Sequence, residues 1–227
     1  MHYLLLITLV LALIYAPQWW VQHILSRYNR QDEDFPGTGG ELARHLLDRF
    51  ELKDIRVEAT ESGDHYDPLS KTVRLTRDKM EGRTLTAITT AAHEVGHAIQ
   101  HASGYRPFRL RMGLARIAIV SQKLGSFLLF LAPLLAGITR APSSGAIMLL
   151  AAIITMGTGL IVQLITLPVE WDASFGKAMP ILTQGKYIDA SQEKKAKRIL
   201  KACALTYVAS SLAGLLNFWR WMQVLRR

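Results

Sequence analysis

Long uncharged stretches of apolar residues constrain this chain more than any other feature. The first runs from Tyr3 to Val21 and ends at Trp19 and Trp20, and the second runs from Leu124 to Thr139. A third extends over 141–169, and a shorter fourth extends over 202–219. About 20 apolar residues are enough for a helix to cross a bilayer. The stretches therefore predict a mainly α-helical membrane protein with three to four transmembrane helices.

The ends of the stretches indicate how each one sits in a membrane. The first, within 1–24, follows no basic residue and precedes no small-residue cleavage site, so it is typical of an uncleaved anchor with tryptophans at the interface. The second and third flank Arg140–Gly145, where proline, serine and glycine favour a turn, so 117–169 is expected to form a helical hairpin. The fourth, within 202–222, either spans the bilayer or lies in its interface.

Basic residues are concentrated in two polar regions. Residues 23–116 and 170–201 hold 22 of the 27 Lys and Arg residues of a chain with a net charge of +9. Two expected crossings separate these regions, so they share a side, and their basic excess predicts that this side is the cytoplasm. We expect the lipid bilayer as a partner and no nucleic acid, because no nucleic-acid-binding pattern accompanies the charge.

The first polar region is expected to contain a small α+β domain at 41–116, which follows a linker at 25–40. A short amphipathic helix is predicted at Glu41–Phe50. The alternating runs Ile55–Ala59 and Thr72–Leu75 predict a two-stranded hairpin or a small sheet. Residues 170–201 form a second cytoplasmic segment in this scheme.

The segment from Thr84 to His101 predicts a helix with metal-binding capacity. His93 and His97 are four residues apart, so their imidazoles project from one face and can bind one ion, with Glu94 beside them. This is the H-E-x-x-H arrangement of zincins. His101 lies about 12 Å from His93 along a straight helix, too far to share the ion, so it is expected in the second shell or on the surface.

A catalytic zinc ion needs a third protein ligand and an open position for water. Glu170 is the candidate, because it stands at the cytoplasmic end of the third apolar stretch, where an acidic residue indicates a functional site. Asp172 is the alternative, either as a ligand or as a residue that orients a ligating histidine.

Three motifs, taken in order, resemble one known family over nearly the whole chain. They are Asp64-His-Tyr-Asp-Pro-Leu-Ser-Lys71, His93-Glu-Val-Gly-His-Ala-Ile-Gln100 and Leu167-Pro-Val-Glu-Trp-Asp-Ala-Ser174. The sequence thereby resembles the YugP-type membrane zinc metallopeptidases, also called neutral zinc metallopeptidases. The resemblance implies a gluzincin of the bacterial cytoplasmic (inner) membrane, related to HtpX-like and CAAX prenyl proteases.

The resemblance also implies roles for individual residues. One zinc ion per chain is expected on His93, His97 and Glu170, with Glu94 as the catalytic acid and base. HtpX-like enzymes carry an Asp four residues after the ligand Glu, where this chain has Ser174, which leaves Asp172 as a substitute. Phe175 and Gly176 also depart from the basic residues usual in the family.

The expected function is hydrolysis of peptide bonds in membrane or membrane-proximal proteins at the cytoplasmic bilayer surface, with Glu94 as general base on zinc-bound water. His65 and Tyr66 are candidates for stabilising the oxyanion, although a tight turn explains their motif equally well. A substrate strand is expected to pair with Thr72–Leu75. A non-proteolytic, zinc-stabilised membrane scaffold or quality-control partner is the alternative function, and the sequence leaves the oligomeric state open.

Overall fold

The computed structural model describes residues 2–30, 35–139, 143, 146–148, 150, 151, 162 and 165–206. In chain order its elements are α1 (His2–Arg27), α2 (Gly39–Arg49), β1 (Arg56–Thr60), β2 (His65–Asp67), β3 (Thr72–Thr76), α3 (Arg77–Met80), α4 (Leu85–Ala102), α5 (Arg106–Thr139), the π-helix η1 (Asp172–Ala178) and α7 (Met179–Gln184). Further helical residues lie at 165–171 and 190–206. The chain divides into unit 1, which contains residues up to Tyr105 and from Leu167 onward, and unit 2, which contains Arg106–Thr166.

Helix α2 begins with a capping box. The Thr38 hydroxyl accepts a hydrogen bond from the Glu41 backbone N–H at 3.2 Å, and the Glu41 carboxylate accepts one from the Thr38 N–H at 2.7 Å. The apolar side chains Leu42, Leu46 and Leu47 are buried, and α2 packs on α4. The amphipathic helix expected in this region is therefore present, and it forms one wall of the unit 1 core.

The sheet has three strands in the order β1-β3-β2. Strand β3 is central, parallel to β1 and antiparallel to β2, so that Val73 lies opposite both Val57 and Tyr66. Of the two arrangements expected for Ile55–Ala59 and Thr72–Leu75, the small sheet is confirmed, and the two-stranded hairpin is wrong because β2 intervenes and β1 runs parallel to β3. The expected pairing of substrate with Thr72–Leu75 is contradicted at Thr72–Arg74, where both edges of β3 are already paired.

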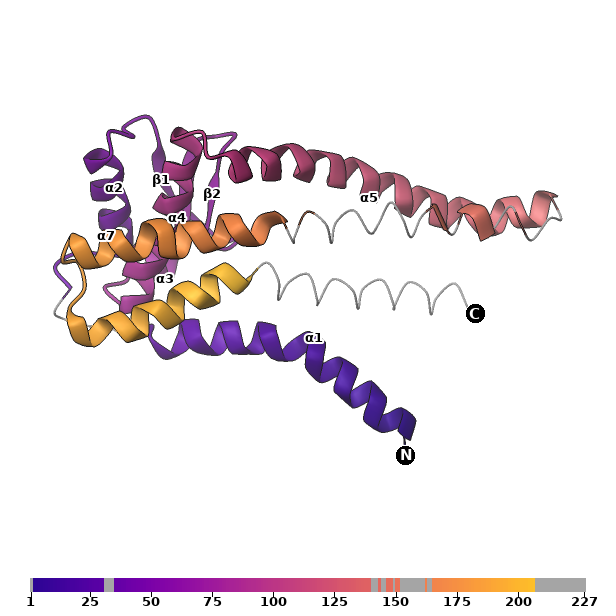
Figure 1. Cartoon of the computed structure of the whole chain (residues 1–227), viewed down its shortest axis with the longest axis horizontal. Coiled ribbons are helices and arrows are strands. Elements are labelled where there is room, and N and C mark those ends of the chain that lie inside the picture. Colours follow the sequence, from indigo (N-terminus) through magenta and orange to yellow (C-terminus); the bar gives the residue numbers. More distant parts are fainter. Residues whose placement is uncertain are drawn as a thin grey trace. The chain divides into compact units, whose positions relative to one another are not determined.

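Helix α4 lies at the centre of unit 1. The Thr84 hydroxyl caps its start by accepting a hydrogen bond from the Ala87 N–H at 3.0 Å. Fifteen of its 18 residues are buried, and it packs against α2, the sheet, α3, α7 and η1. In Figure 1 the orange ribbon of η1 and α7 lies against α4. Gly96 makes this approach possible, because a Cβ there would stand 2.8 Å from the Ala173 carbonyl oxygen.

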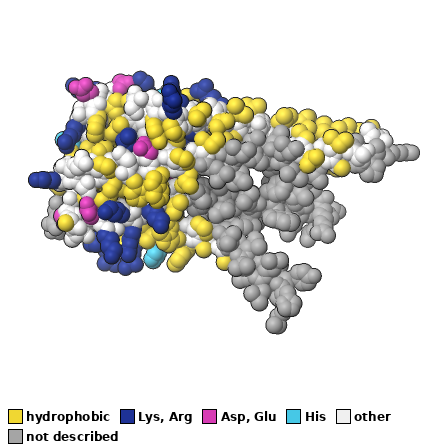
Figure 2. Space-filling model, viewed as in Figure 1, with side chains coloured by type: hydrophobic (Ala, Val, Ile, Leu, Met, Phe, Trp, Pro, Cys, Tyr) yellow, Lys and Arg dark blue, Asp and Glu magenta, His cyan; other side chains and the backbone are white. Residues whose placement is uncertain are grey.

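Helix α5 is the one helix, in the part of the chain that the structure describes, that is long and apolar enough to cross a membrane. It runs for 34 residues and begins at Arg106, inside the range predicted for the α+β domain. Large apolar side chains such as Ile117, Phe127 and Phe130 are exposed along it. Figure 2 shows hydrophobic side chains in yellow over this helix. The prediction of three to four transmembrane helices is therefore not borne out.

Protein burial accounts for part of the apolar sequence that this prediction assigned to lipid. Val21 and Ile24, in the last turns of α1, are 3% and 7% exposed, and Val169 is fully buried. Residues 202–204, at the start of the fourth stretch, are likewise buried. Hydropathy responds to apolar composition and does not distinguish a protein core from a bilayer. The expected turn at 140–145, apart from residue 143, and the residues from 207 onward lie outside the described residues.

Candidate metal centre

Helix α4 places two imidazole rings next to each other. His93 and His97 are one helical turn apart, and their ring centroids are separated by 4.7 Å with an interplanar angle of 78°. The two residues are only 3% and 5% exposed, and Glu94 beside them is 6% exposed. Buried polar groups of this kind need specific partners, because burial without them is costly.

Glu170 supplies the third group, from the helical segment 165–171. Its Oε2 lies 3.3 Å from His93 Nε2 and 3.1 Å from His97 Nε2. One ligand atom from each residue lies within 4.8 Å of the other two, and all three residues are buried. Two imidazole nitrogens and one carboxylate oxygen form a donor set found in catalytic zinc sites. These residues therefore fit a zinc ion.

The charge state of Glu170 suits this role. Burial alone would raise the pKa of its carboxyl group, but the nearby charge of His97 and hydrogen bonds from both histidines lower that pKa below its ordinary value. The carboxylate is the form of the side chain that binds metals.

Ser174 contacts the other side of the His93 ring. Its hydroxyl lies 3.0 Å from His93 Nδ1 and donates a hydrogen bond to the Leu200 carbonyl at 3.1 Å. Ser174 is fully buried in η1, four residues after Glu170. Ser174 is therefore in contact with a candidate ligand.

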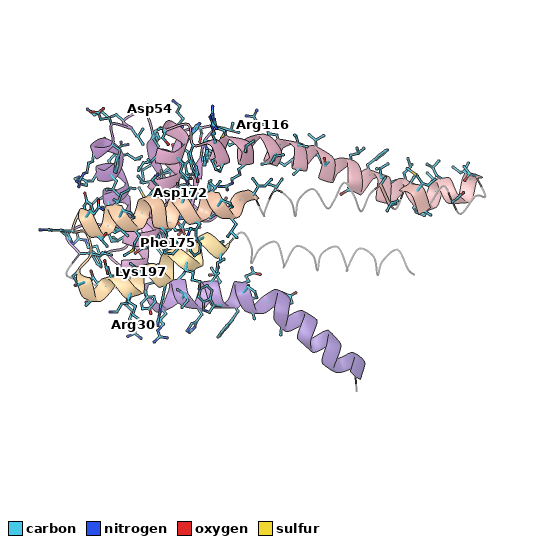
Figure 3. All side chains as sticks on the ribbon, in the orientation of Figure 1. Arg30, Asp54, Arg116, Asp172, Phe175 and Lys197 are labelled. Atoms are coloured by element: carbon cyan, nitrogen blue, oxygen red, sulfur yellow. The ribbon has the colours of Figure 1, made fainter. Side chains whose placement is uncertain are left out.

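Gln100 contacts Nδ1 of His97, as Ser174 contacts Nδ1 of His93. Its Oε1 lies 3.0 Å from His97 Nδ1, and its Nε2 donates to Asp172 Oδ2 at 2.8 Å. Asp172, labelled in Figure 3, is not part of the three-residue ligand group found among the described residues. It reaches His97 through Gln100, which is an indirect form of the orienting role that we considered for it.

The remaining predicted site residues make other contacts. The Tyr66 hydroxyl lies 2.9 Å from His101 Nδ1, and His65 Nδ1 lies 2.8 Å from the Gly63 carbonyl oxygen. Tyr66 and His101 line a cavity of about 200 Å³, whose wall also includes Asp54. Burial, reinforced by the charges of Asp54 and Asp67, raises the pKa of Tyr66 to about 12. The described contacts therefore pair Tyr66 with His101.

Sequence reasoning missed Gln100, although a signal for it existed. Gln100 follows His97 by three positions on one helix, a spacing at which side chains meet. The π-helical form of η1 had no comparable signal in the sequence. It places Asp172 above Gly176, where a Cβ would stand 2.3 Å from Asp172 Oδ1. Such helices are rare and often occur at functional sites.

Comparison with known proteins agrees with this geometry. Residues 3–226 match the family described as "Putative neutral zinc metallopeptidase". The chain is 34% identical, over 226 residues, to "Putative membrane protease YugP" of Bacillus subtilis (strain 168), covering 99% of this chain and 96% of that protein. No solved structure matches the chain significantly. The family description implies zinc as the metal and peptidase as the general activity. The chain belongs to the neutral zinc metallopeptidase family.

Proposed function

We propose that this protein is a zinc metalloendopeptidase that hydrolyses peptide bonds in membrane or membrane-proximal proteins. The observation that carries the proposal is the convergence of His93 and His97 of α4 with Glu170 of the segment 165–171, whose ligand atoms lie within 4.8 Å of one another, while Glu94 is also on α4. We further propose that it works at the cytoplasmic face of a bacterial membrane. The exposed apolar surface of α5 and the relative's description as a membrane protease support association with a membrane.

Glu94 carries the proton transfers in this mechanism. Zinc, when bound by His93, His97 and Glu170, would act as a Lewis acid toward water and the scissile carbonyl. The Glu94 carboxylate accepts a proton from the water molecule as the new C–O bond forms. Glu94 then gives that proton to the amide nitrogen as the C–N bond breaks, which releases a carboxylic acid and an amine. One carboxyl group thus serves both steps and ends in its starting state.

A zinc-stabilised scaffold that does not cut its partners is the second candidate. The burial of all three ligand residues favours it, because structural zinc sites are closed. Structural sites are also usually rich in cysteine and have four protein ligands. Glu94 distinguishes the two candidates, because a scaffold does not require a proton acceptor beside the ligands.

The test compares the zinc-loaded full chain with Glu94→Gln in detergent micelles. We expect Glu94→Gln to bind one zinc ion per chain and to cleave fluorescently labelled casein about 10²- to 10⁴-fold more slowly than the unaltered chain. Glu61→Gln is the matched control, because the Glu61 side chain is 90% exposed, and it should cleave at the normal rate. Equal rates for Glu94→Gln and the unaltered chain would refute the mechanism. Zinc binding without any cleavage by the unaltered chain would favour the scaffold.

A further inference from the structure

We propose that Gln100 is a positioning residue that, together with Ser174, locks both histidines in the tautomer needed for metal binding. The inference rests on the proposed zinc site and adds a statement about how the chain prepares that site. In a neutral imidazole one ring nitrogen carries the proton and the other carries the lone pair. Binding through Nε2 therefore requires the proton on Nδ1 of both rings.

The hydrogen bonds of Gln100 permit only one orientation of its amide. The side chain is fully buried, and its Nε2 donates to the Val169 carbonyl oxygen at 2.9 Å and to Asp172 Oδ2 at 2.8 Å. Neither acceptor can donate a hydrogen bond in return, so both amide hydrogens are committed to them. Oε1 must then face His97 Nδ1, which it does at 3.0 Å. An oxygen at this place requires the proton on His97 Nδ1.

Ser174 imposes the same condition on His93 by simpler means. A serine hydroxyl has a single hydrogen, and that of Ser174 is donated to the Leu200 carbonyl oxygen at 3.1 Å. Its oxygen can then only accept from His93 Nδ1, which is 3.0 Å away. Nε2 of each ring, which faces Glu170 Oε2, is thus the nitrogen left to bind the metal. Such preorganisation reduces the free-energy cost of orienting the two rings when a metal binds.

The hydrogen-bond network behind His97 and the one behind His93 differ in charge. Behind Gln100 stands the Asp172 carboxylate, with Lys177 Nζ 3.7 Å from its Oδ2, whereas Ser174 is backed by a neutral backbone carbonyl. A chain from carboxylate through amide to imidazole polarises the ring and makes its Nε2 a stronger ligand. We therefore infer that His97 is the stronger of the two histidine ligands.

Gly176 leaves space for the Asp172 carboxylate that accepts a hydrogen bond from Gln100. A Cβ at this position would stand 2.3 Å from Asp172 Oδ1, so any larger residue would displace the carboxylate that holds the Gln100 amide.

The test uses the full chain in detergent micelles, with zinc as the probe. Gln100→Met keeps the side-chain length and removes the hydrogen bonds, and Ser174→Ala is the matched variant at the other histidine. We expect Gln100→Met to weaken zinc binding about 10- to 100-fold, by competition with a chromophoric chelator, and Ser174→Ala to weaken it less. In metal-free protein with ¹⁵N-labelled histidine, Gln100→Met should lose the Nδ1–H signature of His97 alone.

A double variant that moves the carboxylate from position 172 to position 100 should restore the hydrogen bond to His97 Nδ1. In Gln100→Glu/Asp172→Asn the new carboxylate can accept from His97 Nδ1, and the new amide can donate to that carboxylate. The double variant should recover the Nδ1–H signature and most of the zinc affinity lost in Gln100→Met. Asp172→Asn alone should weaken zinc binding relative to the unaltered chain, because it changes the acceptor of Gln100 Nε2. This variant keeps the proposal testable if Gln100→Met does not fold.

Two outcomes would overturn the inference. One is a Gln100→Met protein with unchanged zinc affinity and an intact His97 Nδ1–H signature. The other is a loss of affinity that merely follows a loss of thermal stability in the metal-free protein, with no change in tautomer. Failure of the proposed function would look different, because the unaltered chain would then bind no zinc at this site.

Discussion

Helices α4 and α5 follow each other in the chain, but α4 buries polar side chains and α5 exposes apolar ones. Helix α4 carries histidine, glutamate, glutamine and threonine side chains, yet almost all of its residues are buried. Helix α5 exposes large apolar residues along its length, including Ile117, Val120, Phe127, Phe130 and Ile138. In the first helix the unusual feature is buried polarity, and in the second it is exposed apolar surface. Each departure from the normal pattern of a water-soluble helix indicates a function.

The contrast separates two kinds of requirement. Helix α4 needs partners for its buried polar groups, and the site residues provide them to one another through Glu170, Gln100 and Ser174. Helix α5 needs an apolar surrounding, which lipid supplies. Changes that remove a partner should therefore damage α4, and changes that add a polar group should damage α5.

Removal of the third ligand should have the largest effect. Glu170→Ala leaves two imidazoles and no carboxylate, so zinc binding should weaken by more than about 100-fold, beyond the range usual for residues outside the ligand set. Competition with a chelator measures this directly. Asp172→Ala is the control and should have a smaller effect, because Asp172 acts through Gln100. Similar losses in both variants would contradict the assignment of Glu170 as the ligand.

A carboxylate on α5 should have the next largest effect. Phe127→Glu is expected to disfavour membrane insertion of α5 by about 3 kcal/mol, because an acidic side chain at the centre of a membrane helix is costly. A glycosylation-mapping assay of insertion measures this change. Phe50→Glu alters an exposed phenylalanine in unit 1, next to α2, and should leave insertion unchanged. Unchanged insertion of Phe127→Glu would show that α5 is not in the bilayer.

Glycine substitutions should sharpen the same comparison. Gly96→Ala places a Cβ 2.8 Å from the Ala173 carbonyl oxygen and should lower the free energy of unfolding by about 1–3 kcal/mol. Gly113→Ala in α5 meets nothing within 4 Å and should stabilise the helix by up to about 1 kcal/mol. Thermal unfolding in detergent tests both variants. Equal effects would mean that the close approach of α4 and η1 does not exist in solution.

A fall in pH should destabilise unit 1 and leave the helical content of α5 unchanged, and this effect should be the smallest of those predicted here. Hydrogen bonds, first from Ser70, lower the pKa of Asp67 below its ordinary value against the opposing effect of burial, and Arg74 adds to the lowering. The stability that this group contributes is therefore present above about pH 4, the ordinary range of the unfolded carboxyl, and is lost as pH falls toward the lower folded pKa. Asp67→Asn should be less stable near neutrality and should show a shallower decline from pH 5 to pH 2. Because α5 contains no Asp or Glu, its helical content should not change over this interval.

The sequence allowed the local part of the site to be predicted. His93, Glu94 and His97 follow from helical spacing, and Glu170 follows from its place after an apolar stretch; the structure brings His93, His97 and Glu170 together. The hydrogen-bond network around these residues could not be predicted as well from the sequence. Gln100 acquires its role only when η1 packs on α4, which depends on tertiary contacts.

The fold was predicted less well for two physical reasons. Strand β2 has three residues, too few for an alternating pattern to be recognised, so its reversal of the chain went unnoticed. The ends of several apolar stretches, such as Val21 and Val169, belong to the core of unit 1. Hydropathy cannot assign such residues to protein or to lipid.

The zinc K-edge X-ray absorption spectrum of the zinc-loaded full chain tests the central claim most directly. Our account predicts one zinc ion per chain with first-shell nitrogen and oxygen atoms at about 2.0–2.2 Å and scattering from two imidazole rings. His97→Ala should remove the scattering of one ring. A sulfur shell at about 2.3 Å, or imidazole scattering that is unchanged in His97→Ala, would contradict a site made by His93, His97 and Glu170.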